Sequence, residues 1–285
     1  MNKYILILFL ITTHLFASSQ VNLVEVKMKA KQVNNIVKAK ILITGDFRVP
    51  SVLKNNENYF ITRVMATIDG DIVYDISLSH TFQSSRRLQF VLKFNFLYKG
   101  RGNTLTFTLT DNKGKQFQYN IKIKNSLGKN DKLNSQTKIF KPIDYRKENP
   151  KLWEYTNTNK AIKALYGISK GTSNVININL DEYDSSLRAY HVRFNIHSKI
   201  KMKTIAIFSD DLTNFPDRKK SPSIRAIISL PENTTVDFLS FNILTLGTCC
   251  VDWSVPITIV GVDKDGHVYQ TVMDATLYCS ADCET

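Results

Sequence analysis

Two hairpin patterns, 152 residues apart, restrict this 285-residue chain to a fold built from antiparallel strands. Residues 104–110 alternate polar and apolar side chains with a period of two, as a half-buried strand does, and residues 117–124 resume the alternation. Between them, Asp111-Asn112-Lys113-Gly114 has aspartate first and glycine fourth, the preference of a type I turn. The second half repeats this turn as Asp263-Lys264-Asp265-Gly266, between alternating residues 256–262 and a strand that returns from His267.

Further short strands and one helix complete the expected pattern. Asp69-Gly70 stands between two apolar runs, as in a two-residue hairpin loop. Residues 159–166 are the expected helix, which Gly167 would end because glycine accepts the left-handed backbone of a helix terminus. The remaining strands are expected at residues 38–44, 88–95, 175–179, 191–196, 204–208 and 224–230.

This succession of short strands predicts an all-β fold with two antiparallel, immunoglobulin-like β-sandwich domains joined by a linker. Residues 126–158 are rich in Lys, Asn, Ser and Thr, contain Pro142 and Pro150, and show no sustained apolar period, so they are the expected linker. The domains would then cover residues 22–125 and 159–285. The matching turns fit either shared ancestry or chance, because Asp-x-x-Gly turns are common.

The first 19 residues have the form of a secretory signal peptide. Lys3 precedes the apolar residues 4–11, and the small residues Ala17-Ser18-Ser19 follow. The apolar run is shorter than the roughly 20 residues that cross a bilayer, and no later segment reaches that length without charges. We therefore expect a mature protein without a membrane span, exported to a compartment in which disulfides persist.

The positive charge of the chain is concentrated in its first half. Of the net +13, residues 22–124 contribute +10, from 17 Lys/Arg and 7 Asp/Glu, whereas residues 161–285 carry −2, from 12 Lys/Arg and 14 Asp/Glu. A basic half favours anionic partners, such as acidic proteins or small oxyanions, although the two halves could instead attract each other. Export and the lack of a nucleic-acid-binding motif argue against nucleic acid.

The sequence contains no motif that supports hydrolytic, redox or metal-dependent catalysis. The sequence lacks a Gly-x-Ser-x-Gly elbow, a His-Glu-x-x-His zinc motif, a phosphate-binding glycine loop and a haem attachment motif. His191 and His197 would share one face of a strand, but two histidines are too few for a metal site. We therefore expect neither an enzyme nor a resident metal or other cofactor.

The first half contains Ile43-Thr44-Gly45, residues 58–61 with Val64, residues 69–73 and 88–94, Lys99-Gly100 and residues 111–115. The second half contains residues 161–167, Ser223-Ile224-Arg225 and residues 263–283. The first set resembles the Z subunit, and the second set the Y subunit, of the periplasmic sulfur-oxidation (Sox) carrier family, so the resemblance covers most of the chain. It implies a fused carrier of thiosulfate-derived sulfur in the periplasm, with a Z-like first half and a Y-like second half.

The resemblance also implies the attachment site and the partners. The family carries its sulfur compound on a cysteine two residues from the end of the Y subunit, a position that Cys283 occupies, with Cys279 as the second choice. A c-type cytochrome would load the carrier, and a hydrolase and an oxidising enzyme would unload it. The glycines that flank the family cysteine are absent, and Asp282 and Glu284 are expected to raise the pKa of the Cys283 thiol and disfavour the thiolate.

The other cysteines leave the disulfide pattern open. Cys249 and Cys250 are adjacent, so either could pair with Cys279 and leave Cys283 free. Two disulfides, in contrast, would leave no free thiol in the tail to carry sulfur. The alternative to a carrier is therefore a non-catalytic exported β-sandwich binding module with purely structural disulfides. A thiol–disulfide relay between Cys279 and Cys283 is disfavoured, because no helix start is present to lower a thiol pKa.

Arg86 and Arg87 are the expected docking surface for partner enzymes. They are adjacent and precede an expected strand of the basic half. The alternative is a solvated turn, since most exposed charges contribute little to stability or binding.

Overall fold

The computed structural model describes residues 24–45, 59–80, 89–97, 102–125, 140–168, 171–172, 174–180, 191–210, 220–231, 239–244 and 253–277. The strands of the first half are β1 (Val24–Val33), β2 (Ile36–Gly45), β3 (Ile61–Ile68), β4 (Asp71–Leu78), β5 (Gln89–Leu97), β6 (Thr104–Asp111), β7 (Gln116–Lys122) and β8 (Lys124–Asn125). The helices are α1 (Tyr145–Glu148), the 3-10 helix η2 (Pro150–Glu154) and α2 (Thr158–Tyr166). The strands of the second half are β9 (Ile176–Leu180), β10 (His191–Ser198), β11 (Met202–Ser209), β12 (Ile224–Ser229), β13 (Leu239–Leu244), β14 (Trp253–Asp263) and β15 (Val268–Leu277).

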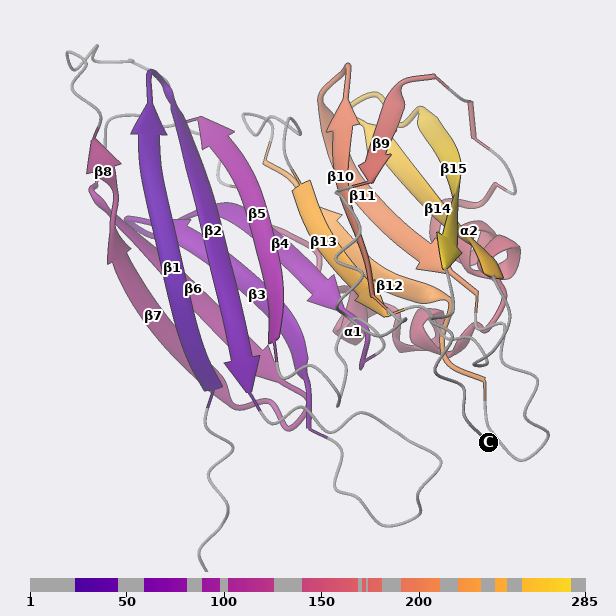
Figure 1. Cartoon of the computed structure of the whole chain (residues 1–285), viewed down its shortest axis with the longest axis horizontal. Coiled ribbons are helices and arrows are strands. Elements are labelled where there is room, and N and C mark those ends of the chain that lie inside the picture. Colours follow the sequence, from indigo (N-terminus) through magenta and orange to yellow (C-terminus); the bar gives the residue numbers. More distant parts are fainter. Residues whose placement is uncertain are drawn as a thin grey trace, which may run out of the picture.

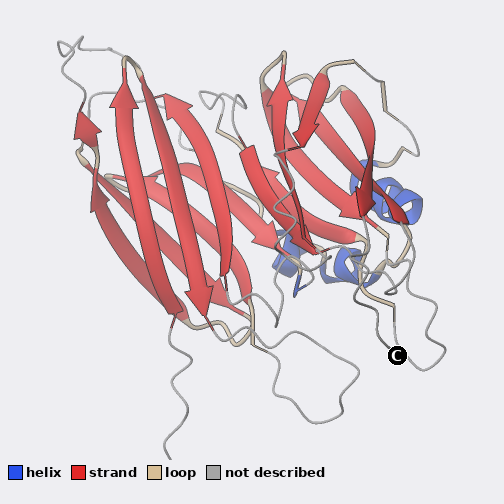
Figure 2. Cartoon of the chain, in the orientation of Figure 1, coloured by secondary structure: helices blue, strands red, loops and turns tan. Residues whose placement is uncertain are grey.

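These strands form two sheets, each of which runs through both halves of the chain (Figure 1). One sheet has the order β8-β1-β2-β5-β13-β10-β9, and the other has the order β15-β14-β11-β12-β4-β3-β6-β7. The halves are joined within the sheets, because β13 pairs with β5 and β12 pairs with β4, both antiparallel. The prediction of an all-β, antiparallel sandwich fold is confirmed, and strands make up most of the described chain in Figure 2.

We call the β4–β12 and β5–β13 pairings the joint between the halves. Both halves have the same strand topology when the strands are followed outward from this joint. In the eight-stranded sheet β4-β3-β6-β7 corresponds to β12-β11-β14-β15, and in the seven-stranded sheet β5-β2-β1 corresponds to β13-β10-β9. The registers agree as well, since β3–β6 shifts between Ile61 and Arg63 and β11–β14 shifts at the corresponding place, between Met202 and Thr204. Val64 and Ile205, each one residue past its shift, pair with Ile76 and Ile228. Ile76 and Ile228 in turn pair with each other. The two halves are thus related by an approximate two-fold axis through this pair.

The expected hairpin between β3 and β4 is confirmed by its backbone. Asp69 and Gly70 have φ values of 47° and 85°, and Ile68 pairs with Asp71 across them. Left-handed geometry at both loop positions is what a type I′ turn requires, and aspartate followed by glycine tolerates it best. The other expected strands also overlap observed ones, whereas β1 and β13 were not predicted.

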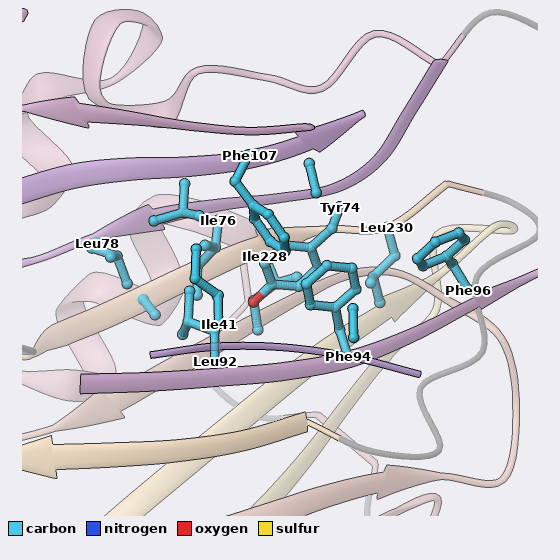
Figure 3. Packing of buried hydrophobic residues seen from close by; sticks show 14 of the residues in the cluster. Ile41, Tyr74, Ile76, Leu78, Leu92, Phe94, Phe96, Phe107, Ile228 and Leu230 are labelled. Atoms are coloured by element: carbon cyan, nitrogen blue, oxygen red, sulfur yellow. The ribbon is translucent and has the colours of Figure 1, made fainter. Parts of the chain in front are cut away.

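The main core lies between the two sheets and continues across the joint. Strand β2 shows how the sequence builds it, since Val37, Ala39, Ile41 and Ile43 are buried while the intervening lysines are exposed. At its centre the Tyr74 and Phe94 rings stack with centroids 4.0 Å apart, and Phe107 meets Phe94 edge-on (Figure 3). Ile228 and Leu230 of the second half belong to the same cluster.

A second, smaller core lies where η2 and α2 pack on the eight-stranded sheet. Leu152, Trp153, Ala161 and Ile162 of the helices are buried against side chains of β11, β12 and β14, namely Ala206, Phe208, Ile224, Ile227 and Val260. Helix α2 matches the expected one: the Asn157 side chain accepts from the Lys160 N–H at 3.1 Å, and Gly167 ends it with φ 73°. Among the described residues, no helix is long and apolar enough to cross a membrane.

The segment expected to link the halves has structure of its own where it is described. Residues 140–157 include α1 and η2, and Leu152 and Trp153 within η2 are buried. Helices of four and five residues are too short to produce a helical period in the sequence, which is why the apolar pattern gave no sign of them. The domain limits themselves stay a prediction.

Candidate functional site

The hairpin of β14 and β15 leads directly into the C-terminal cysteine tail. The two strands pair from Val262–Val268 at the turn to Trp253–Leu277 at the open end. Strand β14 is anchored in both cores, through Ile257 and Ile259 on one face and Val260 on the other. Strand β15 forms the edge of the eight-stranded sheet, so the chain leaves this sheet at its margin.

The turn of this hairpin is closed by the side chain of Asp263. Its Oδ1 accepts from the Asp265 N–H and from the His267 N–H, each at 2.9 Å. The Asp111 carboxylate closes the corresponding turn in the same way, with Oδ1 accepting from Lys113 N at 2.9 Å and from Lys115 N at 2.8 Å. Gly114 and Gly266, with φ of 81° and 87°, occupy the fourth position of each turn. The sequence match at an offset of 152 therefore reflects one turn geometry used twice.

Asp263 also contacts the side chains of two later residues, His267 and Tyr269. Asp111 has Lys115 and Phe117 at the matching positions. His267 Nδ1 lies 3.0 Å from Asp263 Oδ2, and the Tyr269 hydroxyl donates to the same oxygen at 3.1 Å. Desolvation opposes ionisation of the Asp263 carboxyl, but the hydrogen bonds from His267, Tyr269 and Asp265 outweigh it and hold its pKa below the ordinary value. Asp263, Asp265 and His267 could each offer a metal ligand within 4.8 Å of the others. Both Asp263 oxygens already accept hydrogen bonds within the turn, however, so the turn is closed without a cation.

A short segment before β9 covers the first part of the β15 edge. The Gln270 N–H donates to Thr172 O at 2.7 Å, and the Thr172 N–H donates to Val268 O at 3.1 Å. Gly171 approaches so closely that an added Cβ would lie 2.9 Å from the Gln270 backbone nitrogen. A glycine is therefore required for this backbone approach, which fixes the start of the strand that carries the tail.

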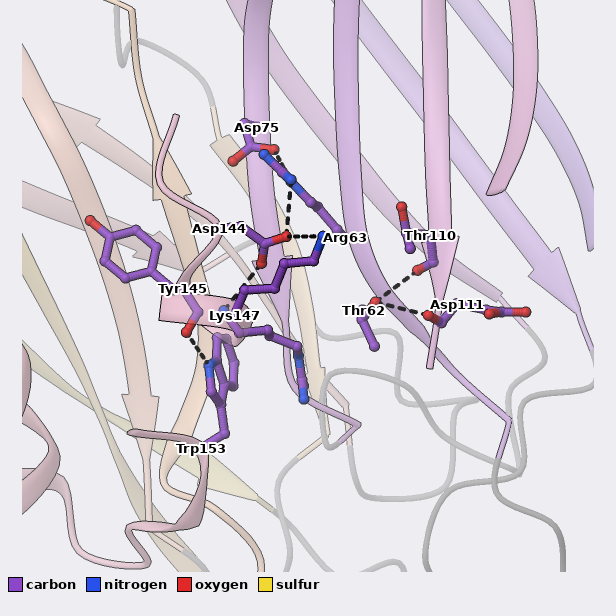
Figure 4. Close-up of polar contacts among 10 residues, drawn as sticks. Thr62, Arg63, Asp75, Thr110, Asp111, Asp144, Tyr145, Lys147 and Trp153 are labelled. Carbon is purple, nitrogen blue, oxygen red and sulfur yellow. Dashed lines mark hydrogen bonds and ion pairs between the residues drawn. The ribbon is translucent and has the colours of Figure 1, made fainter. Parts of the chain in front are cut away.

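A partly buried ion-pair network joins the first half to α1 (Figure 4). Arg63 of β3 contacts Asp75 Oδ1 of β4 through Nε at 2.6 Å and Asp144 Oδ2 through a terminal nitrogen at 3.2 Å. Asp75 is only 1% exposed. Burial raises the pKa of its carboxyl to about 6, the negative Asp144 adds to this rise, and the hydrogen bond and charge of Arg63 oppose it.

Arg146 of α1, two residues after Asp144 of this network, contacts both the end of β4 and the second core. Its guanidinium donates to the carbonyl of Leu78, the last residue of β4, with Nε at 3.0 Å. The same group lies over the Trp153 ring, 4.3 Å from its centroid, while Trp153 donates to Tyr145 O at 3.2 Å. Burial lowers the pKa of Arg146 to about 10, against the opposing effect of Asp144. Because Trp153 belongs to the second core, Arg146 connects the joint between the halves to that core.

The Ser223-Ile224-Arg225 segment also lies at this joint. The Arg225 side chain is fully buried and donates from a terminal nitrogen to Ser209 O at 2.7 Å. Its own carbonyl accepts from the Ser79 N–H of the first half at 2.9 Å, and Ser223 donates to Tyr155 O at 2.8 Å. This segment therefore holds β12 against both the first half and the chain that precedes α2.

The residues predicted to carry function fall outside the described parts of the chain. These are Cys249, Cys250, Cys279, Cys283, Arg86 and Arg87. The network around Asp75 and Arg146 was missed by sequence analysis. In the sequence, Asp75 stands between the apolar residues Tyr74 and Ile76 of a strand. Such a position normally faces solvent, so nothing in the sequence pointed to a buried aspartate there.

No protein-family model matches the chain, and no curated protein matches it. Among solved structures, the sulfur carrier protein SoxY from Chlorobium limicola f thiosulfatophilum is similar over 44% of this chain and 96% of its own. The sequence identity is 19% and the TM-score is 0.30. At this TM-score the overlap carries no argument about function.

Proposed function

We propose that the chain is an exported carrier without catalytic activity of its own, which holds a sulfur compound covalently on a tail cysteine, Cys283 before Cys279. The position of β15 carries this proposal, because the strand lies at a sheet edge and ends at Leu277, directly before the residues that contain both thiols. A thiol that follows an edge strand starts from the margin of the molecule rather than from its core. Separate enzymes could reach such a thiol in turn, which is what a carrier requires.

The loading step is an oxidation that joins two sulfur atoms. The Cys283 thiolate and thiosulfate combine to Cys–S–S–SO₃⁻ with the loss of two electrons, which a c-type cytochrome would accept one at a time through its haem. A hydrolase would then release sulfate from the adduct by adding water, and an oxidising enzyme would act on the sulfur that stays behind. Since Asp282 and Glu284 flank Cys283, its thiolate is disfavoured, and enzymatic rather than spontaneous loading is expected.

We further propose a disulfide between Cys279 and either Cys249 or Cys250. Trp253 and Leu277 pair at the open end of the hairpin, and in the sequence Cys249 and Cys250 come four and three residues before Trp253, whereas Cys279 comes two residues after Leu277. At roughly 3.5 Å per extended residue, these lengths of chain allow either pairing. Such a bond would secure the end of β15 and leave Cys283 as the thiol that is loaded.

The test is mass analysis of the intact protein and its non-reduced peptides. Protein from cells that oxidise thiosulfate should carry a sulfur-containing adduct on Cys283 that a reductant removes, and a disulfide between Cys279 and Cys249 or Cys250. In vitro, tetrathionate supplies the oxidant: the thiolate displaces thiosulfate from it and gives the same Cys–S–S–SO₃⁻ adduct. The variant Cys283→Ser should fold and lose the adduct, whereas the matched variant Cys249→Ser should keep it.

Two results would decide against this assignment. An adduct on Cys279 would move the site but retain the function. Four cysteines that all lie in intramolecular disulfides would exclude the carrier, and the chain would then be the non-catalytic binding module with purely structural disulfides.

A further inference from the structure

The outer face of β1 and β2 presents an array of lysines, which we call the lysine face. It consists of Lys27, Lys29 and Lys31 on β1 and Lys38 and Lys40 on β2, and all five are exposed. Their neighbours in sequence, such as Ala30, Val37 and Ala39, are buried in the core. The period of two along each strand therefore places every one of these lysines on one side of the sheet, the side away from the eight-stranded sheet (Figure 1).

The registers bring these positive charges together across the strands. Lys29 pairs with Lys40, and Lys31 pairs with Lys38. Lys40 in turn pairs with Lys93 of β5, and Lys31 pairs with Lys124 of β8. Like charges directly opposite each other destabilise a sheet, so this arrangement works against folding. Within the described parts of the chain, none of the five lysines forms an ion pair that would relieve the repulsion.

The second half differs at the corresponding row of this sheet. The row Lys29–Lys40–Lys93 continues across the β5–β13 pairing as Ser240, Asn195 and Asn179, which are uncharged. Asn195 is only 9% exposed, so the neutral side chain at this place fits its burial. Lys40, its counterpart, is exposed, and the first half therefore presents a charged surface where the second half covers its own.

The composition of the face identifies the chemistry of its partner. We propose that the lysine face binds the surface of an anionic phospholipid bilayer. Binding sites for proteins are depleted in lysine and enriched in arginine and aromatic residues, and the described outward positions of β1 and β2 contain neither arginine nor an aromatic residue. Lysines are mobile point charges that suit a diffuse layer of phosphates, and the face of a sheet meets such a layer over its whole area.

An apolar row beside the lysines fits the same partner. At the β1–β2 turn, Val33 pairs with Ile36, and Ile36 pairs with Leu97 on the same face. Val33 is 38% exposed and the other two are half-buried. Apolar side chains next to a cationic patch add to the attraction by entering the boundary between headgroups and acyl chains. The hairpin tip would enter this boundary while the lysines contact phosphates.

The test is co-sedimentation of the full chain with vesicles of two compositions. Pure phosphatidylcholine vesicles serve as the neutral probe, and vesicles of equal parts phosphatidylcholine and phosphatidylglycerol serve as the anionic probe. We expect binding to the anionic vesicles alone, and a loss of binding as salt is added. Each lysine contributes about fivefold to partitioning, so the triple variant Lys29→Gln, Lys38→Gln, Lys40→Gln should bind about a hundredfold more weakly.

A matched variant controls for net charge. Lys151→Gln, Lys160→Gln, Lys163→Gln also removes three exposed positive charges, but from η2 and α2 on the other sheet. It should bind anionic vesicles within about threefold of the wild type. The proposal is overturned if the wild type does not bind anionic vesicles, or if this control loses as much binding as the lysine-face variant. Binding to duplex DNA but not to vesicles, abolished by the lysine-face variant, would assign the face to nucleic acid instead. None of these outcomes depends on whether Cys283 carries sulfur.

Discussion

Replacement of Asp75 by asparagine should abolish the pH dependence that this buried carboxyl imposes on stability. Asp75 lies under α1 with 1% of its surface exposed, and the substitution Asp75→Asn retains its shape while it removes the charge. Its pKa is about 6 in the folded protein, against an ordinary value of 3.8, mainly because of burial and in spite of Arg63. The folded state therefore binds this proton more tightly than the unfolded chain does.

The sign and the size of the effect follow from this difference. A raised carboxyl pKa contributes stability that is fully present below about pH 4 and is lost as the pH rises through about 6. The pKa difference corresponds to about 3 kcal/mol in the free energy of unfolding. The wild type loses this stability as the pH rises, and the asparagine variant has no such loss, so the variant should gain about 3 kcal/mol relative to the wild type between about pH 4 and pH 7.

Urea unfolding at several pH values in this window measures the effect. All other titrating groups are common to both proteins, so they cancel in the difference between the two unfolding free energies. A difference that stays constant with pH would show that the Asp75 pKa is not raised. A difference that shifts in favour of the wild type at higher pH would show that the Arg63 ion pair, rather than burial, controls this carboxyl.

Three further predictions concern the packing and the turns. Trp153→Ala should lower the free energy of unfolding by about 3–5 kcal/mol in urea titrations, because it empties the second core; a loss below about 1 kcal/mol would mean that η2 is not packed there. Asp111→Ala and Asp263→Ala should each lower the Tm, because each carboxylate accepts two backbone N–H groups of its turn, and the double variant should lower it by the sum. The loss should be larger for Asp263→Ala, whose carboxylate also accepts from Tyr269 and contacts His267; a larger loss for Asp111→Ala would contradict this. Gly171→Ala should speed hydrogen exchange at the Gln270 amide, because the added Cβ would push apart the two backbones that this amide joins. Unchanged exchange would show that the segment around Gly171 can shift and keep the hydrogen bond from Gln270 to Thr172.

The regular parts of the fold follow from local patterns in the sequence. Alternation at residues 104–110 and 256–262 predicted β6 and β14, and Asp-x-x-Gly predicted both hairpin turns, because period and turn chemistry act over a few residues. The helix α2 was predicted for the same reason, with Gly167 at its end. Strand β1 has the same alternation, with Val26, Met28 and Ala30 between charged residues, and was missed although the signal is present.

The candidate site depends on contacts between distant segments. Asp75 is buried because α1, some 70 residues later in the chain, covers the outer face of its strand and brings Asp144 to Arg63. No local pattern distinguishes such an aspartate from an exposed one. The cysteine tail was singled out from sequence alone, and its attachment to an edge strand comes from the pairing of β15 with β14.

The sequence by itself therefore determined the elements: which stretches are strands, where they turn, and which residues alternate between the core and solvent. The tertiary structure decided how the strands are joined. Pairing of β4 with β12 and of β5 with β13 makes two continuous sheets with an approximate two-fold axis, and the pairing of β1 with β2 gathers the lysines of both strands on one face. The physical reason is that side-chain period and turn preference are local properties, whereas the partner of a strand edge is set by the burial and backbone pairing that the whole chain can achieve at once.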